Sequence, residues 1–365
     1  MKIVVILFIC LILHFLWEYK SHRKNVERIP LRILVNGTRG KTTVTRIITY
    51  ALQESGMKTV GRSSGSSLEI IHSDGKVEKV ERRRRANIRE MIPFFRLALE
   101  EKAEAVVVED MALTEENQRV LRDNLVKPDI VVITNTYIDH VPEMGRTTEE
   151  TAWCLSRSVP SSALLYTTED HYQKYSSKVR KVEEEAPPSS SSPIPLHPST
   201  WAIAKRVLLD LGVKEETILS ALNRLPEEIG LMKEIALPSS SVLIPTFSVN
   251  DRECMRLTIL EEMEKHPGMK CEVVFNNRKD REHRVILLEE VLSSIEKDRR
   301  PSVMVIGDYR GKVSFHLNRR GFDALPFSLE EAMERMKTQD NTLFIGLGNI
   351  KGEGEKLLSF TFNIS

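Results

Sequence analysis

A short glycine-containing loop between a predicted strand and a predicted helix is the strongest constraint in this sequence. Residues 32–36 are largely apolar, as a buried strand is, and the loop G-T-R-G-K-T at residues 37–42 follows directly. Residues 42–55 then have the period of an amphipathic helix, which Gly56 ends. Such a turn can wrap phosphate groups with the backbone N–H groups of a helix N-terminus. The sequence therefore predicts an α/β domain that binds a nucleotide.

Two side chains of this loop have the chemistry that phosphates and their metal ion require. Lys41 would bring positive charge to the terminal phosphates, and the Thr42 hydroxyl would face a magnesium ion. The loop is shorter than an ordinary P-loop, because Val35 stands where the first glycine is expected. The predicted nucleotide-binding residues here are Gly37, Thr38, Arg39, Gly40, Lys41, Thr42 and Thr43.

Polar residues at the ends of two further predicted strands suggest a metal site. Glu109 ends the strand 105–109, and Asn135 and Asp139-His140 follow the strand 130–134. Ligands of open α/β sheets collect at the carboxyl ends of the strands. Alone, a glutamate there is more often solvated or caps a helix. With the loop, Thr42, Glu109 and His140 are predicted magnesium ligands, with Asn135 on the nucleotide.

Alternating apolar strands and amphipathic helices predict two α/β domains after an N-terminal segment. We expect a membrane anchor with a basic flank at 1–24, an ATP-binding domain at 25–235 and a smaller C-terminal α/β domain at 236–365. An acidic run and a Pro/Ser tract predict a flexible connector at 183–198. Further strands are expected at 163–166, 242–245, 272–276, 303–307 and 343–346, and helices at 88–102, 115–125, 201–211, 215–225, 255–265, 285–297 and 328–336.

The first residues predict a transmembrane helix. Residues 3–17 are almost continuously apolar, and Lys20, Arg23, Lys24 and Arg28 follow. A full crossing needs about 20 residues, which Trp17 and Tyr19 help to supply. A cleaved signal peptide is the alternative, but the charge lies after the run and no small-residue cleavage pattern follows. By the positive-inside rule we expect a single-pass protein of the cell membrane with its body in the cytoplasm.

Composition excludes some other classes. The net charge of +1 gives no whole-chain case for binding nucleic acid. The four cysteines form no CxxC pair, which argues against a zinc ribbon and against a disulfide scaffold.

Three motifs in order carry a family resemblance: G-T-R-G-K-T, V-V-V-E-D-M-A at 106–112, and N-T-Y-I-D-H-V-P-E-M-G at 135–145. They resemble the central ATPase domain of the Mur ligases. The N-terminal anchor and the tail G-L-G-N-I-K-G at 346–352 are most similar to the ligase subunit of capsular poly-γ-glutamate synthase. The resemblance covers nearly the whole chain and is weakest in the middle.

The resemblance implies an ADP-forming ligase that uses ATP and Mg²⁺. Lys41 and Thr42 would hold the triphosphate and its metal, with Glu109 and His140 as magnesium ligands. ATP would phosphorylate a substrate γ-carboxylate, and the amine of an incoming glutamate would attack the acyl phosphate. The implied partners are glutamate, the growing poly-γ-glutamate chain and other membrane subunits of the synthase.

Several positions depart from the family pattern or admit two interpretations. Pro142, Pro198 and Lys233 stand where relatives commonly carry an acidic residue, an adenine-contacting Asn and an Arg. Arg278, with Asp280 and Arg281, would close over the phosphates, or form an exposed ion-pair cluster. The run Arg82 to Arg85 would hold a polyanionic chain, or be a solvated arm.

Two rival functions remain at this stage. One is a catalytically degenerate subunit that binds nucleotide and organises membrane partners, which Pro142 and Pro198 favour. The other is a P-loop kinase or transport ATPase, which the short loop and the Asp139-His140 pair disfavour.

Overall fold

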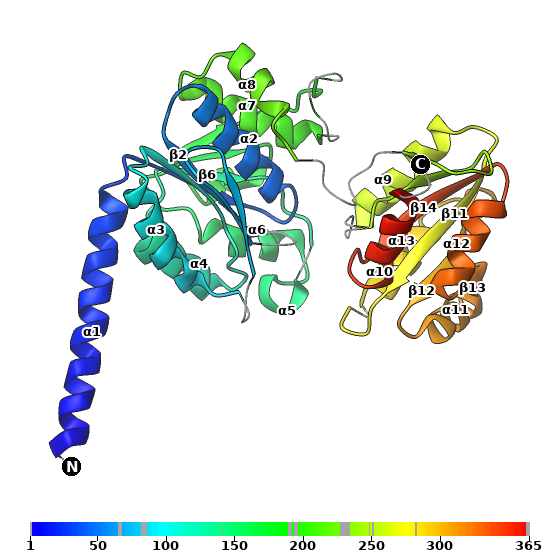
Figure 1. Ribbon diagram of the computed structural model, residues 1–365, viewed down its shortest axis with the longest axis horizontal. Helices are drawn as coiled ribbons and strands as arrows, with labels where there is room; N and C mark the ends of the chain where they lie inside the picture. Colours follow the sequence, from blue (N-terminus) through cyan, green and yellow to red (C-terminus); the bar gives the residue numbers. More distant parts are fainter. Residues whose placement is uncertain are drawn as a thin grey trace. The chain divides into compact units, whose positions relative to one another are not determined.

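The computed structural model shows two compact units, Met1–Leu225 and Pro226–Ser365 (Figure 1). The predicted boundary between residues 235 and 236 stays a prediction. The structure describes residues 2–64, 68–81, 86–138, 140–188, 192, 196–226, 234–247, 249, 252–281 and 283–362.

Unit 1 is built on a mostly parallel sheet with the order β4-β3-β2-β5-β1-β6-β7-β8. The pairs from β2 through β8 are parallel, and β3 pairs antiparallel with both β2 and β4. The strands are β1 (Leu31–Asn36), β2 (Thr59–Ser63), β3 (Leu68–Ile71), β4 (Val77–Val80), β5 (Ala105–Glu109), β6 (Ile130–Ile133), β7 (Leu164–Thr167) and β8 (Val179–Lys181).

Helices cover both faces of this sheet. The helices of unit 1 are α1 (Lys2–Glu27), α2 (Lys41–Glu54), α3 (Met91–Glu100), α4 (Glu115–Val120), α5 (Val141–Met144), α6 (Thr148–Ser156), α7 (Pro198–Asp210) and α8 (Glu215–Leu222), with the 3₁₀ turns η1 (Ile88–Glu90) and η3 (Asp170–Lys174) and the π-helix η2 (Leu121–Val126). The apolar faces of α2, α7 and α8 form one core with the sheet, and α3, η2, α6 and the end of α1 form the other. The predicted three-layer α/β fold is confirmed.

The antiparallel edge of this sheet was not predicted. The β4 side chains are mostly exposed, so its sequence lacks the apolar run of a covered strand. Asp74 and Gly75 form the turn between β3 and β4, where the Gly75 N–H donates to the His72 carbonyl at 2.9 Å. An Asp-Gly pair between short strands is a hairpin signal, and it was available in the sequence.

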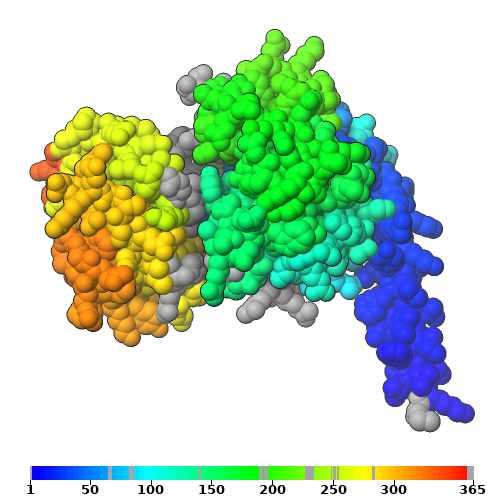
Figure 2. Space-filling model, turned by 180° about the vertical axis from the view of Figure 1, so that it is seen from behind, coloured from blue at the N-terminus to red at the C-terminus, as the bar shows by residue number. Residues whose placement is uncertain are grey.

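Helix α1 runs without a break from the exposed apolar segment into the core of unit 1 (Figures 1 and 2). Val26 is fully buried and His22 is 2% exposed. The His22 ring lies edge-on to Phe95, with centroids 5.5 Å apart, and its Nε2 is 3.0 Å from the Leu125 carbonyl oxygen. The last turns of α1 are therefore structural parts of the domain.

The preceding part of α1 is a candidate membrane span by length and composition. Its apolar side chains from Ile3 to Trp17 are exposed, whereas the end of the same helix is packed. Exposed apolar area on this scale is unfavourable in water and favourable in a bilayer.

Unit 2 is a second three-layer α/β unit, with the sheet order β13-β12-β11-β14-β10-β9. Its pairs are parallel except β9 with β10. The strands are β9 (Ile235–Ala236), β10 (Val242–Ile244), β11 (Lys270–Asn277), β12 (Ser302–Gly307), β13 (Ala324–Pro326) and β14 (Thr342–Gly348). The helices are α9 (Arg252–Lys265), α10 (His283–Ser293), α11 (Arg310–Arg319), α12 (Leu329–Thr338) and α13 (Glu353–Phe362), with the 3₁₀ turn η4 (Lys297–Arg299).

Two truncations test whether the end of α1 belongs to the core. A chain lacking residues 2–17 keeps every buried side chain of α1, so its unit 1 should melt close to the temperature of the full chain in detergent. A chain lacking residues 2–28 loses His22 and Val26, which should cost about 3 kcal/mol or more of the free energy of unfolding. Thermal unfolding followed by circular dichroism measures the difference. Equal melting temperatures for the two truncations would contradict this account.

Candidate active site

The loop between β1 and α2 has a backbone conformation that demands glycine at two positions. Gly37 has φ of 121° and Gly40 has φ of 76°. A Cβ atom at Gly37 would lie 2.2 Å from Thr134 Oγ1, and one at Gly40 would lie 2.8 Å from Thr200 Oγ1 on α7. Any larger residue at either position meets both backbone strain and a close neighbour. The two glycines let the loop turn tightly between β6 and α7.

Asn135 fixes the shape of this loop. Its Oδ1 accepts hydrogen bonds from the Thr38 hydroxyl at 2.7 Å and from the Arg39 N–H at 2.8 Å. Its Nδ2 donates to the Arg39 carbonyl at 3.2 Å, and Thr134 Oγ1 donates to the same carbonyl at 2.5 Å. The sequence predicts that Asn135 contacts the nucleotide. In the structure its side chain instead holds the shape of the loop that would bind the phosphates.

The loop leads into an uncapped helix N-terminus. Lys41, Thr42 and Thr43 form the first turn of α2, and the N-cap residue Gly40 has no side chain to accept from their N–H groups. Lys41 Nζ donates to the Gly37 carbonyl at 2.6 Å, which places its ammonium group over the same turn. The N–H groups of this first turn, the positive end of a helix dipole and a lysine together suit the phosphates of a nucleotide.

Glu109 and Thr42 meet beside this turn. The Thr42 hydroxyl donates to Glu109 Oε2 at 2.9 Å, and the Ser64 N–H donates to the same oxygen at 2.7 Å. Glu109 is only 3% exposed. A hydroxyl and a carboxylate in contact next to a phosphate-binding turn are the oxygen donors that Mg²⁺ takes together with phosphate oxygens. These residues fit the predicted metal, and Ser64 is a neighbour that sequence reasoning missed.

Asp110 is a second buried carboxylate that sequence reasoning assigned no role. Its Oδ1 accepts from the Ala112 N–H at 2.7 Å, while Oδ2 is buried with no hydrogen-bond partner. Burial raises the pKa of Asp110 to about 7. The negative charge of Glu109 raises this pKa further, and the positive charge of Lys41 lowers it. The site therefore carries one carboxylate braced by donors and an adjacent one that favours its neutral form.

His140 follows β6, two strands away from Glu109 in the order β5-β1-β6. All three strands are parallel, so the loop, Glu109 and His140 follow the same ends of adjacent strands. His140 has φ of 47°, and its carbonyl accepts from the Glu143 N–H at 2.8 Å at the start of α5. Among the described residues no three His, Cys, Asp or Glu side chains form a metal-holding group. Asp139 lies outside the described residues.

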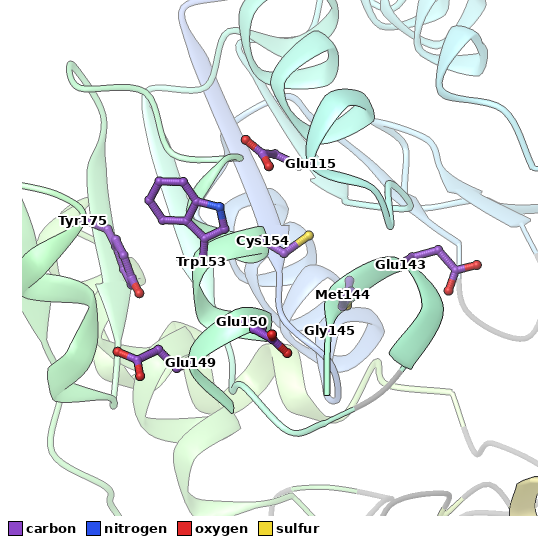
Figure 3. A pocket seen from close by; sticks show the side chains of 9 residues that line it. All are labelled: Glu115, Glu143, Met144, Gly145, Glu149, Glu150, Trp153, Cys154 and Tyr175. Carbon is purple, nitrogen blue, oxygen red and sulfur yellow. The ribbon is translucent and has the colours of Figure 1, made fainter. Parts of the chain in front are cut away.

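A pocket of about 460 Å³ lies between α4, α5 and α6 (Figure 3). Its walls carry aromatic rings and four glutamates, and they comprise Glu115, Glu143, Met144, Gly145, Glu149, Glu150, Trp153, Cys154 and Tyr175. Four carboxylates disfavour phosphate or a carboxylate substrate in this pocket. The α2 N-terminus is the better place for a nucleotide.

Comparison with known proteins finds two family models and two close-length relatives that resemble this chain. The Mur ligase middle domain matches residues 35–184, and the poly-gamma-glutamate synthase CapB C-terminal domain matches residues 233–362. The PGA synthase CapB of Bacillus subtilis (strain 168) is 29% identical, over 93% of this chain and 92% of that protein. The capsule biosynthesis protein CapB of Bacillus anthracis is 28% identical, over 98% of this chain and 82% of that protein.

The chain is thus similar over nearly its whole length to poly-γ-glutamate synthase CapB, with a Mur ligase middle domain followed by a CapB-type C-terminal domain. These matches, with the fold, support an ATP-dependent acid–amino-acid ligase.

Solved structures show the same fold at low sequence identity. A bifunctional folylpolyglutamate synthase/dihydrofolate synthase from Yersinia pestis, complexed with AMPPNP and Mn ion, is 15% identical with a TM-score of 0.66, covering 94% of this chain and 92% of that one. MurF from Acinetobacter baumannii is 15% identical with a TM-score of 0.61, covering 92% of this chain and 78% of that one.

The structure gives one departure from the family pattern a local explanation. Pro198 is the first residue of α7, and the His197 side chain caps that helix by accepting from the Ser199 N–H at 3.3 Å. Proline is favoured at this position because its missing N–H would have no helical acceptor. Pro142 lies within the short helix α5. Lys233 and Arg82 to Arg85 lie outside the described residues.

The family's tail motif is packed around Asn276 in unit 2. Asn349 Nδ2 donates to the Asn276 carbonyl at 3.1 Å, and Asn276 Nδ2 donates to the Lys351 carbonyl at 3.0 Å. Gly348 has φ of 98°, and a Cβ there would lie 2.6 Å from the Asn276 oxygen. Arg278 is in the same unit, where its guanidinium bonds to Asp280 at 2.8 Å. Its predicted place over the phosphates stays a prediction.

Replacing Gly37 with Ala tests the steric demand of the loop. G37A should lose nucleotide binding at least tenfold, because the new methyl group meets Thr134 and the φ is strained. The matched control is G56A, because Gly56 also has positive φ, at 92°, but has no neighbour within 4 Å of the added atom. Calorimetric titration with AMPPNP and Mg²⁺ reads the difference, and equal binding by the two variants would contradict the steric argument.

The raised pKa of Asp110 predicts a pH dependence of stability. The folded-state pKa of about 7 lies above the ordinary value of 3.8. The contribution of Asp110 to the free energy of unfolding is therefore complete below about pH 4 and is lost as pH rises through about 7. D110N keeps a neutral side chain, so without nucleotide it should exceed the wild type in stability at pH 8, by about 4 kcal/mol at most. Urea unfolding from pH 5 to pH 8 measures the gap, which should shrink toward pH 5. A gap independent of pH would refute this assignment.

Proposed function

We propose that this chain adds glutamate to a poly-γ-glutamate chain in an ATP-dependent, ADP-forming reaction. The observation that carries the proposal is the contact of Thr42 with Glu109 beside the uncapped N-terminus of α2. The first turn of α2 thus has backbone N–H groups that can bind phosphate, and oxygen atoms that can bind a divalent cation lie beside it. Both relatives are named for synthesis of this polymer or of a capsule.

The substrate class draws on the names of related proteins. One relative is a PGA synthase, and a structure with the same fold holds Mn, AMPPNP and L-glutamate. Glutamate as the incoming amino acid and ATP as the energy source agree with both. Mg²⁺ is the proposed metal, because hard oxygen donors beside phosphates are its usual ligands.

In the proposed mechanism the chain's own residues hold and neutralise the reacting groups. Lys41 and the N–H groups of the first α2 turn would bind the triphosphate, and Thr42, Glu109 and His140 would hold the metal. When bound, the metal supplies positive charge beside the phosphates. Thr134 and Asn135 act as positioning residues, because their side chains hydrogen-bond to the loop that would bind the phosphates.

The chemistry proceeds in two steps. A γ-carboxylate oxygen of the polymer attacks the γ-phosphorus of ATP, and the bond to the β-phosphate oxygen breaks to release ADP. The amine of glutamate then attacks the acyl carbon, phosphate departs with the bonding electrons, and the nitrogen loses a proton as the amide forms. Activation is needed because a carboxylate oxygen is a poor leaving group until it is phosphorylated.

We propose that α1 crosses the cell membrane once and that both units face the cytoplasm. Lys20, Arg23 and Lys24 follow the apolar run on the domain side, as the positive-inside rule requires. Cleavage after the apolar run as a signal peptide would place the new terminus beside the packed residues His22 and Val26. Other membrane subunits of a synthase are the proposed partners.

A catalytically degenerate subunit is the second candidate. Two departures from the sequence pattern of relatives favoured this function, Pro142 and Pro198. Pro198 is explained as the first residue of α7, whereas Pro142, near His140, still favours the degenerate subunit. Dependence of ADP release on glutamate separates the two functions.

Replacing Lys41 with Ala should reduce glutamate-dependent ADP release at least a hundredfold, because the ammonium group that neutralises the phosphates is lost. The matched control is K58A, since Lys58 is an exposed lysine of the same unit and should leave the rate unchanged. The assay uses membranes that contain the full chain and its partner proteins, with ADP and polymer both measured. Continued polymer synthesis by K41A would contradict the ligase assignment. ADP release that does not depend on glutamate in the wild type would favour the degenerate subunit.

A further inference from the structure

A polar pocket of about 340 Å³ lies on unit 1 away from the phosphate loop. It is bounded by η2, by the end of α6 and by the chain after η3. Its lining carries one carboxylate, that of Asp123, which Arg122 pairs. The other charged and hydroxyl groups of the serines and arginines on the lining come from Arg122, Arg157, Ser156, Ser161 and Ser176. Such a lining suits an oxyanion.

Arg157 is held in place without a carboxylate. Its guanidinium carbon lies 3.5 Å from the centroid of the Trp153 ring, and its NH2 group donates to Ser156 Oγ at 3.2 Å. Across the part of the chain that the structure describes, no ion pair joins Arg157 to an acidic residue. Burial lowers the pKa of Arg157, and the charges of Arg119 and Arg122 lower it further. The pocket thus holds a preorganised cation that an anion would stabilise.

The neighbouring arginines each have their own carboxylate. Arg122 bonds to both oxygens of Asp123 at 2.6 Å, and Arg119 pairs with Glu115. An anion that enters the pocket would therefore pair with Arg157. Its planar fork matches the geometry of a phosphate group. The Ser156 hydroxyl donates to the Trp153 carbonyl at 2.6 Å, so the hydroxyls of the lining that would face the anion are those of Ser161 and Ser176.

The same π-helix that supplies Arg122 also receives the membrane helix. The Tyr19 hydroxyl donates to Asn124 Oδ1 at 3.3 Å, and His22 Nε2 lies 3.0 Å from the Leu125 carbonyl oxygen. Tyr19 comes two residues after Trp17, where the exposed apolar run ends, and an α-helix rises about 1.5 Å per residue. When that run lies in a bilayer, η2 is at the depth of the lipid headgroups.

We propose that this pocket binds the phosphate of an anionic phospholipid headgroup. The proposal rests on the membrane placement proposed above and does not require ligase activity. Headgroup phosphates are the oxyanions concentrated at the depth of η2, and the cytoplasmic leaflet carries a negative surface potential. Inorganic phosphate and the carboxylates of the polymer are the other sources of the same chemistry, and the test distinguishes them.

The test uses the full chain in a neutral detergent and measures retained lipid by native mass spectrometry. Phosphatidylglycerol should bind the wild type about tenfold more tightly than phosphatidylcholine. R157Q and W153L should lose that preference, and R157K should keep only part of it, because lysine has charge but no fork. The matched control is R319Q, since Arg319 also lies near an aromatic ring, that of Phe315 at 5.9 Å, and should bind lipid like the wild type.

Several results would overturn the proposal. Equal phosphatidylglycerol binding by the wild type and a folded R157K or R157Q protein would remove the pocket from lipid binding. Displacement of the lipid by millimolar inorganic phosphate, or by poly-γ-glutamate at equal carboxylate concentration, would assign the pocket to those anions. Glutamate-dependent ADP release is measured separately, for each variant, on membranes that contain the full chain and its partner proteins. Lost lipid preference with retained ADP release in R157Q is the expected result, whereas absent ADP release in the wild type would count against the ligase function alone.

Discussion

The brace from Asn135 to the phosphate loop is the interaction on which the site depends. The four residues between β1 and α2 have no regular secondary structure, so hydrogen bonds from neighbouring residues hold their conformation. Because Asn135 satisfies both the Thr38 hydroxyl and the Arg39 N–H, the loop keeps its turn and α2 keeps an open N-terminus. β1 and β6 are adjacent, which brings Asn135 within reach of the loop, so the order of strands in the sheet sets the shape of the loop.

The second constraint is the concentration of buried charge beside that loop. Glu109 is stabilised by the Thr42 hydroxyl and the Ser64 N–H, whereas one Asp110 oxygen has no donor. Burial is the main cause of the raised pKa of Asp110, and the neighbouring Glu109 carboxylate raises it further. The arrangement leaves one well-defined negative ligand for a cation.

The sequence predicted the parts of the fold whose patterns are local. The strand 105–109 and the phosphate loop were placed correctly, because a covered parallel strand must be apolar and a tight turn needs glycine. The β3–β4 hairpin was missed, since exposed edge strands lack that pattern. The burial of Asp110 Oδ2 without a hydrogen-bond partner, and the hydrogen bonds of Asn135 to the loop, depend on residues distant in sequence. A local sequence pattern does not predict such contacts.

Packing ties the proposed membrane anchor to the site. Val26 of α1 belongs to the same buried core as Leu34 of β1 and Val108 of β5, the strands that end at the loop and at Glu109. Interiors are close-packed, so α1 cannot turn against these strands without opening that core. The direction in which α1 leaves the domain therefore fixes the direction in which the ends of β1 and β5 face. A bilayer that holds α1 would orient the phosphate loop at the same time.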